Sequence, residues 1–230
     1  ALHRDRKDIE SDPRHYRKWE LCLKTNPQRV RDIEEAMRGA DVLIALSTPG
    51  PDVVKQDWIK LMADKSIVFA CANPVPEIYP HAAREAGAFI VATGRGDFPN
   101  QVNNSLGFPG ILKGALLVRA KKISDGMAIA ASYSLADYAE KRGIHPDNIL
   151  PTMDEVGVFP HEAKDVAQEA IRENLARVEI SQEEAFSRAE KDIKYARELV
   201  QMMMKEGFIP TPPESLLQEA LDWAMQQISV

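Results

Sequence analysis

The sequence lacks the motifs that most directly identify a phosphate or metal site. No segment matches the glycine-rich GxGxxG pattern of dinucleotide-binding folds or a Walker loop. Acidic residues form no obvious metal-binding cluster, and none of the five histidines has ligand spacing to another histidine or a cysteine. No tyrosine or lysine has a local partner typical of a general acid or base. We therefore expect neither catalytic nor metal-binding residues from these patterns.

Cysteine is also scarce, with two residues in a chain of 230. Cys22 and Cys71 lie far apart in the sequence, so we expect no disulfide framework and a reducing, cytoplasmic setting. Cys71 lies within an apolar run and is expected to be a small buried residue.

Long apolar runs are absent as well. None approaches the roughly 20 residues that span a bilayer, and the charged N-terminus has no apolar core of a signal peptide. The net charge is -6, with both signs interspersed along the chain. Neither a nucleic acid nor a membrane is therefore expected as a partner.

Three short apolar runs alternate with helical patterns in the first half of the chain. Such alternation predicts a doubly wound, Rossmann-like α/β fold with a parallel sheet covered on both faces. The expected strands are residues 41–46, 67–72 and 88–92, and the expected helices are residues 30–37, 53–63 and 77–85. Residues 1–29 show no clean periodicity. The strand ends near Ser47, Asn73 and Thr93 should share one edge of the sheet, where ligands bind in this architecture.

The chain after Gly110 reads almost entirely as helix. Ser124 and Ser181 are expected N-caps, and Gly143 is expected just beyond a helix C-terminus. The predicted helices are residues 111–120, 124–142, 162–178 and 182–205, and a last helix that residues 211–214 open and that runs to about residue 228. The fold is therefore predicted as an incomplete parallel sheet followed by a helical C-terminal region.

One of these helices carries an apolar seam with heptad spacing. Its members are Phe186, Ala189, Ile193, Ala196, Val200 and Met203. The seam fits an amphipathic helix packed on its own domain, and it also fits a subunit interface. Fewer than three heptads do not decide between the two interpretations.

Polar, neutral side chains gather where the predicted strands end. Residues 93–110 contain Asn103 and Asn104 before a helix, and Asn73 follows the second strand. Carboxamides there can bind a carboxylate or another carboxamide without a charge of their own. The simpler alternatives are that Asn73 caps a turn and that one of Asn103 and Asn104 is an N-cap. Residues 47–50 follow the first strand, as a plain turn or a cofactor-contacting loop. Asp97 could bind a metal, but we expect it to be solvated.

At these residues the chain resembles the malic enzyme family, in its short prokaryotic form. The motifs are Ala-Asn-Pro-Val-Pro-Glu-Ile at 72–78, Ala-Thr-Gly-Arg-Gly-Asp-Phe-Pro-Asn-Gln-Val-Asn-Asn at 92–104 and Leu-Gly-Phe-Pro-Gly at 106–110. Residues 2–4, 39–50 and 113–120 fit as well, so the resemblance extends to about residue 180. It implies the regions 1–120 for most of the cofactor domain, 121–180 for helices that return to the catalytic core, and 181–230 for a helical extension.

The resemblance implies oxidative decarboxylation of L-malate to pyruvate and CO2 with NAD or NADP and Mg2+ or Mn2+. It assigns Asn73 to the nicotinamide end of the cofactor and Asn103 or Asn104 to malate and the nicotinamide. The loop that lines the cofactor groove comprises Ser47, Thr48, Pro49 and Gly50.

In the family, the catalytic tyrosine and lysine, the acidic metal ligands and the glycine-rich loop precede the part that aligns with Ala1. The chain is therefore expected to need the N-terminal half of the same enzyme as a partner, to form a homodimer or larger oligomer, and to be inactive alone. Asp5 stands where the family commonly has glycine, and the choice between NAD and NADP stays open. A non-catalytic dinucleotide-binding or dimerisation module, or another NAD(P)-dependent dehydrogenase, are the alternatives.

Overall fold

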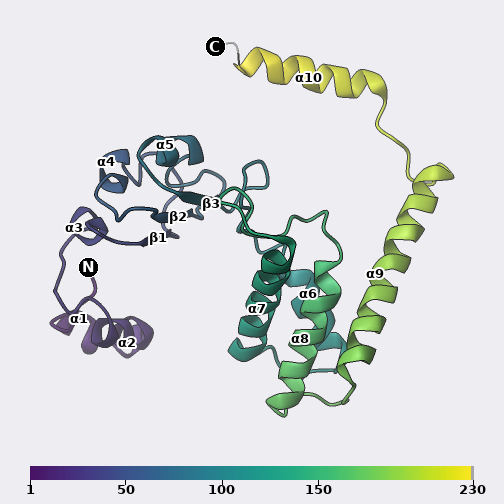
Figure 1. Ribbon diagram of the computed structural model, residues 1–230, viewed down its shortest axis with the longest axis horizontal. Coiled ribbons are helices and arrows are strands. Elements are labelled where there is room, and N and C mark those ends of the chain that lie inside the picture. Colours follow the sequence, from purple (N-terminus) through teal and green to yellow (C-terminus); the bar gives the residue numbers. More distant parts are fainter. Residues whose placement is uncertain (229–230) are drawn as a thin grey trace. The chain divides into compact units, whose positions relative to one another are not determined.

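The computed structural model describes residues 1–228, which form two compact units (Figure 1). The first unit combines Ala1–Phe108 with Ser132–Glu155, and the second combines Pro109–Ala131 with the chain from Val156 onward. This division does not test the regions predicted as 1–120, 121–180 and 181–230, which stay predictions. None of the described helices has the length and apolar content that a membrane span requires.

A three-stranded parallel sheet forms the centre of the first unit, in the order β1-β2-β3. Its strands are β1 (Val42–Ala45), β2 (Ile67–Ala70) and β3 (Ile90–Thr93), and the helices around them are α3 (Ile33–Met37), α4 (Gln56–Ile59) and α5 (Pro80–Glu85). The core contains Ile59, Val68, Ile78 and Val91. The predicted parallel α/β sheet is thus confirmed, with each strand near its expected position.

The prediction that both faces of the sheet are covered is wrong for β1. Val42 and Ile44 are 46% and 63% exposed, and Leu46 just after the strand is 73% exposed. These residues alternate along the strand and so lie on one face. The continuous apolar run correctly predicted a strand with apolar side chains on both faces. No described residue covers the face that carries Val42, Ile44 and Leu46, and β1 is an edge strand.

Several helices of the first unit also differ from expectation. Residues 77–79 precede α5 instead of opening it, because Pro80 takes the first helical turn, where proline is tolerated. The helix expected over residues 53–63 is reduced to α4. The N-terminal region, in which no periodicity was found, contains α1 (Lys7–Glu10), a 3-10 turn (Pro13–His15) and α2 (Tyr16–Lys24). The only buried hydrophobic residues of this region are Ile9 and Cys22. Two buried positions in a charged segment are too few to give a periodicity from which helices could be predicted.

The second unit is helical, as predicted. It contains α6 (Phe108–Leu117) from Pro109 onward, the first residues of α7 (Asp125–Arg142), and α8 (Val158–Arg172), α9 (Gln182–Lys205) and α10 (Glu214–Ile228). The predicted caps are confirmed: Ser124 Oγ accepts from the Met127 amide and Ser181 Oγ from the Glu184 amide, each at 3.1 Å, and Gly143 has a φ of 98°. Helix α8 begins and ends earlier than the expected 162–178.

Glycines let α6 approach α8 closely. A Cβ on Gly114 would lie 2.5 Å from the Ala163 carbonyl oxygen and 2.8 Å from the Val166 Cβ. A Cβ on Gly110 would lie 2.5 Å from the Cβ of Glu162. Backbone and Cβ atoms cannot rotate away, so both glycines are required by the packing of the two helices.

Gly114→Ala is expected to lower the free energy of unfolding by about 2 kcal/mol, the usual cost of overpacking a close contact. The clash outweighs the gain of about 1 kcal/mol that alanine brings to an unobstructed helical position. Urea unfolding followed by circular dichroism measures the difference. A variant more stable than the wild type would contradict the close α6–α8 contact.

Candidate functional site

The carboxyl ends of the three strands meet at one edge of the sheet. Ala45 lies opposite Ala70, which in turn lies opposite Thr93, so the loops after β1, β2 and β3 begin side by side. The Cys71 amide donates to the Ala45 carbonyl oxygen at 3.0 Å. A Cβ on Gly94 would lie 3.2 Å from the Cys71 carbonyl oxygen, so glycine allows the β3 loop to lie close to β2. The strand ends expected to converge on one edge therefore do so.

A buried carboxylate, Glu77, connects two of these loops. Its Oε1 accepts a hydrogen bond from the Ser47 amide at 2.8 Å and its Oε2 accepts one from the Ala72 amide at 3.0 Å. Its own carbonyl oxygen accepts from the Val54 amide at 3.0 Å. The side chain is fully buried, so these bonds are made away from water and are stronger for it. Glu77 thus holds the loop after β1 against the loop after β2.

Glu77→Gln is expected to lower the free energy of unfolding by about 2 kcal/mol, because one backbone N–H would then face an NH2 group and lose its acceptor. Exposed Glu85 on α5 provides the control, and Glu85→Gln should leave stability unchanged. Amide hydrogen exchange at Ser47 and Ala72 should be faster only in the Glu77 variant. Equal exchange in the two variants would show that Glu77 does not secure these loops.

Arg95 secures the loop after β3. Its guanidinium donates two hydrogen bonds to Asp97, at 2.7 and 2.6 Å, and one to the Pro74 carbonyl oxygen at 2.9 Å. The Arg95 guanidinium holds the pKa of the Asp97 carboxyl below its ordinary value. Asp97 is exposed, as expected of a solvated group, but it is ion-paired. Nowhere in residues 1–228 do three or more histidine, cysteine or acidic side chains form a group suited to a metal ion.

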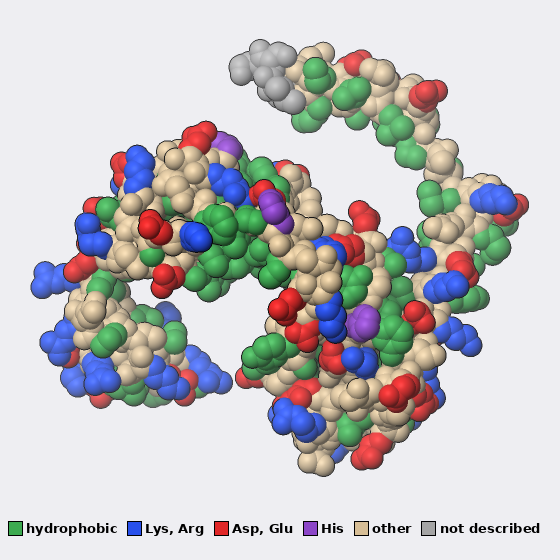
Figure 2. Space-filling model, in the orientation of Figure 1, with side chains coloured by type: hydrophobic (Ala, Val, Ile, Leu, Met, Phe, Trp, Pro, Cys, Tyr) green, Lys and Arg blue, Asp and Glu red, His purple; other side chains and the backbone are tan. Residues whose placement is uncertain are grey.

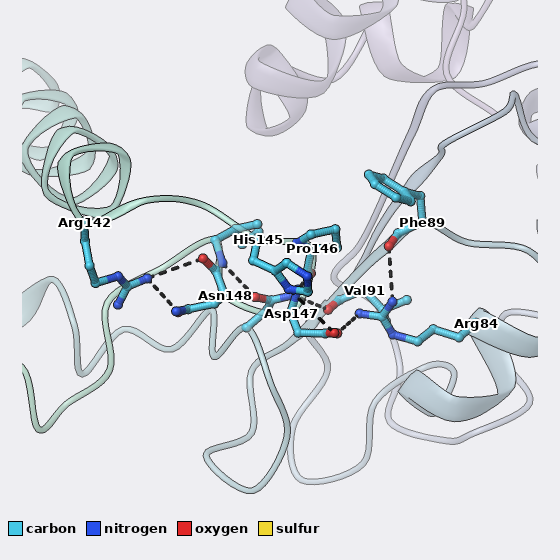
Figure 3. Close-up of polar contacts among 10 residues, drawn as sticks. Arg84, Phe89, Val91, Arg142, His145, Pro146, Asp147 and Asn148 are labelled. Atoms are coloured by element: carbon cyan, nitrogen blue, oxygen red, sulfur yellow. Dashed lines mark hydrogen bonds and ion pairs between the residues drawn. The ribbon is translucent and has the colours of Figure 1, made fainter.

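Asn100 connects the loop after β3 to residues 146–149. With a φ of 56° and only 6% of its surface exposed, it donates to the carbonyl oxygens of Val91 at 3.0 Å and Pro146 at 2.7 Å, and it accepts from the Ile149 amide at 2.9 Å. The segment that carries Pro146 also binds Arg84 through Asp147 (Figure 3). Asn100 is therefore a structural residue, which the sequence did not identify.

The asparagines predicted to bind ligands divide into two groups. Asn103 uses both ends of its carboxamide, since Nδ2 donates to the Gly94 carbonyl oxygen at 2.9 Å and Oδ1 accepts from the Ser105 amide at 2.9 Å. Asn73 and Asn104 are exposed, and neither side chain is hydrogen-bonded to any other described residue. Asn103 therefore stabilises a turn before α6, and the side chains of Asn73 and Asn104 are free to bind a ligand.

The loop after β1 is open to solvent. Ser47, Thr48 and Pro49 are exposed, and Gly50 has a φ of 149°, a backbone conformation that favours glycine. The Gly50 amide donates to the Val75 carbonyl oxygen at 3.3 Å, which keeps this loop beside the loop after β2.

Cys71 at this edge is half-buried, not fully buried as expected, because it follows the last residue of β2 and emerges from the core. Burial, and then the negative charge of Glu77, raise the pKa of its thiol.

Comparisons with known proteins identify relatives of this chain. The bifunctional malic/malolactic enzyme of Bacillus subtilis is 41% identical over 175 residues, which cover 76% of this chain and 42% of that enzyme. The NADP-dependent malic enzyme of Halomonas elongata is 42% identical over 162 residues, covering 64% of this chain and 38% of the relative. The chain thus spans less than half the length of these relatives.

A solved structure extends the similarity to the whole chain. The crystal structure of Entamoeba histolytica malic enzyme is 60% identical, with a TM-score of 0.97, and covers 100% of this chain and 47% of its own. The family model described as "Malic enzyme, NAD binding domain" matches residues 1–173. On this evidence the chain belongs to the malic enzyme NAD-binding domain family.

Proposed function

We propose that the chain is the cofactor- and substrate-binding half of a malic enzyme. In this proposal it acts with a preceding half of the same enzyme in the oxidative decarboxylation of L-malate to pyruvate and CO2, with NAD or NADP and a divalent metal, Mg2+ or Mn2+. The observation that carries the proposal is the pair of free carboxamides, Asn73 and Asn104, near the converging strand ends of a malic enzyme cofactor domain.

The two asparagines are suited to hold an anionic substrate beside a nicotinamide. The Nδ2 group of Asn104 can donate to a malate carboxylate, and the carboxamide of Asn73 can pair with a polar group of the cofactor or substrate. Because both side chains are neutral, they orient the ligand without altering the charge of the reacting atoms. Asn103, which the resemblance also assigns to malate and the cofactor, positions the backbone around Asn104 through its bonds to Gly94 and Ser105.

The residues present fit part of a dinucleotide. Ser47, Thr48 and Pro49 are exposed and Gly50 is partly exposed, and Glu77 holds the loop at the Ser47 amide. The loop offers donors and acceptors to the nicotinamide and ribose side. When bound, NAD(P)+ would accept the hydride from C2 of malate. No segment of the chain matches a glycine-rich loop for the pyrophosphate, so we assign that contact to the preceding half.

The metal does not fit the described residues, since they include no cluster of three suitable ligands. We therefore assign the metal ligands, together with the tyrosine and lysine that act as acid and base in the family, to the preceding half.

The open edge of the sheet supports a partner of this kind. Strand β1 has a neighbour on one side only, and Val42, Ile44 and Leu46 are exposed. A hollow of about 460 Å³ lies beside these residues. An apolar edge strand of this type usually pairs with or is covered by another segment, and we propose that the preceding half provides it.

The experiment is a reconstitution assay. The chain is produced with and without the preceding half, and malate-dependent NAD(P)H formation is measured with Mn2+. We expect turnover only when both halves are present. We also expect the complete enzyme to bind NAD(P)H, both in the absence and in the presence of pyruvate. Turnover with an amino acid but not with malate would favour another dehydrogenase. Cofactor binding with no turnover on any substrate would favour a non-catalytic module.

A further inference from the structure

Helix α9 has two halves in different surroundings. In the first half, Ala185 and Ala189 are fully buried, and the ring of Phe186 lies 4.8 Å from the ring of His161 on α8. This half of the helix packs along α8 (Figure 1). The first members of the heptad seam therefore pack within their own unit, as one of the two sequence interpretations requires.

The second half of the seam continues along α9 with nothing packed on it in the described part of the second unit. Ala196 is exposed, Val200 is 47% exposed, and Met203 is only partly buried. Met202 and Met204 are exposed as well, at 54% and 46%. An apolar surface over residues 196–204 that continues a packed seam costs free energy in water and calls for a second helix.

Helix α10 has a matching apolar stripe. Leu217, Leu221 and Ala224 are spaced four and three residues apart, and the two leucines are 58% and 56% exposed. Trp223 beside them is 65% exposed. Among the described residues of its unit, α10 makes no extended packing contact with another helix. Figure 2 shows hydrophobic side chains exposed on α10 and on the adjoining end of α9.

The two surfaces agree in charge and length. The charged residues of α10 are all acidic, namely Glu214, Glu219 and Asp222. Residues 191–205 of α9 carry a formal charge of +2, from Lys191, Lys194, Arg197 and Lys205 against Asp192 and Glu198. At 1.5 Å per residue the 15-residue α10 is about 22 Å long, and residues 193–205 of α9 extend about 20 Å.

The connection between the helices holds α10 apart from α9. It contains Pro210, Pro212 and Pro213, which favour an extended and stiff segment. The solved Entamoeba histolytica enzyme aligns with all of this chain at a TM-score of 0.97, so both α9 and α10 have counterparts there.

We propose that α10 of one copy packs on the open half of α9 of a second copy, and that the two copies exchange these arms reciprocally. Each copy offers both surfaces, so one twofold-symmetric contact covers the seam and the stripe of both. The contact would join the copies through the C-terminal arm, and its partner is a second copy of this chain.

Cysteine crosslinking tests the contact directly. Val200 lies at the middle of the open seam and Leu221 at the middle of the stripe, so their proximity does not depend on whether the helices run parallel or antiparallel. Full-length Val200→Cys and Leu221→Cys proteins are mixed at low concentration, concentrated and treated with a short bifunctional maleimide. We expect a covalent dimer in the mixture and not in either protein alone, because each molecule of the mixture carries only one of the two positions.

Three controls decide the outcome. The wild type reports any reaction of Cys22 and Cys71. Glu198→Cys, at the same level of α9 but away from the seam, should give no dimer with Leu221→Cys. In the Val200→Cys/Leu221→Cys double variant, a crosslink found within one chain would show that α10 packs on its own α9 and would overturn the proposal. Absence of any product, or equal product with Glu198→Cys, would also overturn it.

A second pair of variants tests which face of α10 makes the contact, with a different crosslinked pair as the readout. Leu217→Glu/Leu221→Glu should weaken the association of the arms by about 100-fold, the effect of placing charges where two leucines are buried at a helix interface. Ser215→Glu/Gln226→Glu adds the same charge on the opposite face of α10 and should leave association unchanged. Each pair of glutamate substitutions is combined with Ala224→Cys and mixed with the Val200→Cys protein. The yield of the crosslink between Val200→Cys and Ala224→Cys is then measured as a function of protein concentration and compared between the two glutamate variants. Equal loss in both would contradict the assigned face.

Discussion

Asn104→Ala is expected to lower kcat/KM for malate by about 100-fold in the enzyme formed with the preceding half, with no change in thermal stability. The Asn104 side chain is exposed and makes no hydrogen bond within the described chain, so its removal takes nothing from the fold. A hydrogen bond to a charged carboxylate contributes about 1.5–3 kcal/mol, and each tenfold change in rate corresponds to about 1.4 kcal/mol. Steady-state kinetics and a melting curve measure the two effects.

Asn103→Ala is the matched control, because it removes the same group one position earlier. It should lower the free energy of unfolding by about 1–2 kcal/mol, since the Gly94 carbonyl and the Ser105 amide both lose a partner. Any kinetic loss should be accompanied by this loss of stability. If Asn103→Ala left stability unchanged and abolished turnover while Asn104→Ala had no effect, the assignments of the two residues would have to be exchanged.

Local sequence signals predicted the features of this fold that depend on local physics. The apolar runs identified three strands because a buried strand needs apolar residues at consecutive positions. Ser181 and Ser124 identified helix starts because a cap bonds to an amide three residues away. The predicted bounds of α9 coincide with the observed Gln182–Lys205.

Long-range contacts account for what the sequence did not reveal. Glu77 accepts from an amide 30 positions earlier, and Asn100 accepts from one 49 positions later. The partners are backbone amides, of Ser47 and Ile149, so no side-chain pattern in the sequence connects them with Glu77 or Asn100. One available signal was Glu77 itself, an acid placed directly after a buried strand and two prolines. The distinction between Asn103 and Asn104 likewise depends on where the Gly94 carbonyl lies, which only the structure shows.

A second buried acid, Glu162, lies at the contact between α8 and α6. It is fully buried, and neither carboxylate oxygen has a well-formed hydrogen bond. Burial raises the pKa of Glu162 to about 8, and the nearby Gly110 amide offsets only part of this effect. The side chain is therefore protonated in the folded protein at neutral pH. In the unfolded chain it is ionised above its ordinary pKa of 4.5.

This difference makes stability depend on pH with a definite sign. Below pH 4.5 both states hold the proton, and Glu162 has no differential effect. Between the unfolded value of 4.5 and the folded value of about 8, unfolding releases a proton, so stability falls by about 1.4 kcal/mol for each pH unit. Above the folded pKa the loss levels off. The cost is about 3 kcal/mol at pH 7 and about 5 kcal/mol at pH 9.

Glu162→Gln is expected to remove this cost, because glutamine fills nearly the same volume and does not titrate. The variant should be within about 1 kcal/mol of the wild type at pH 5, about 3 kcal/mol more stable at pH 7, and more stable still at pH 9. Urea unfolding at the three pH values measures the difference.

Comparison of two proteins that differ at one residue cancels every other titrating group, including His161 beside it. Exposed Glu179 supplies the control, and Glu179→Gln should be neutral at all three values. A constant difference between the Glu162 variant and the wild type across this range would mean that Glu162 is ionised in the fold. The charge would then need a partner close to Gly110 that the described contacts do not include. A difference that grows with pH would instead establish that α6 and α8 pack around a neutral acid, and that Gly110 is required at this contact to leave room for it.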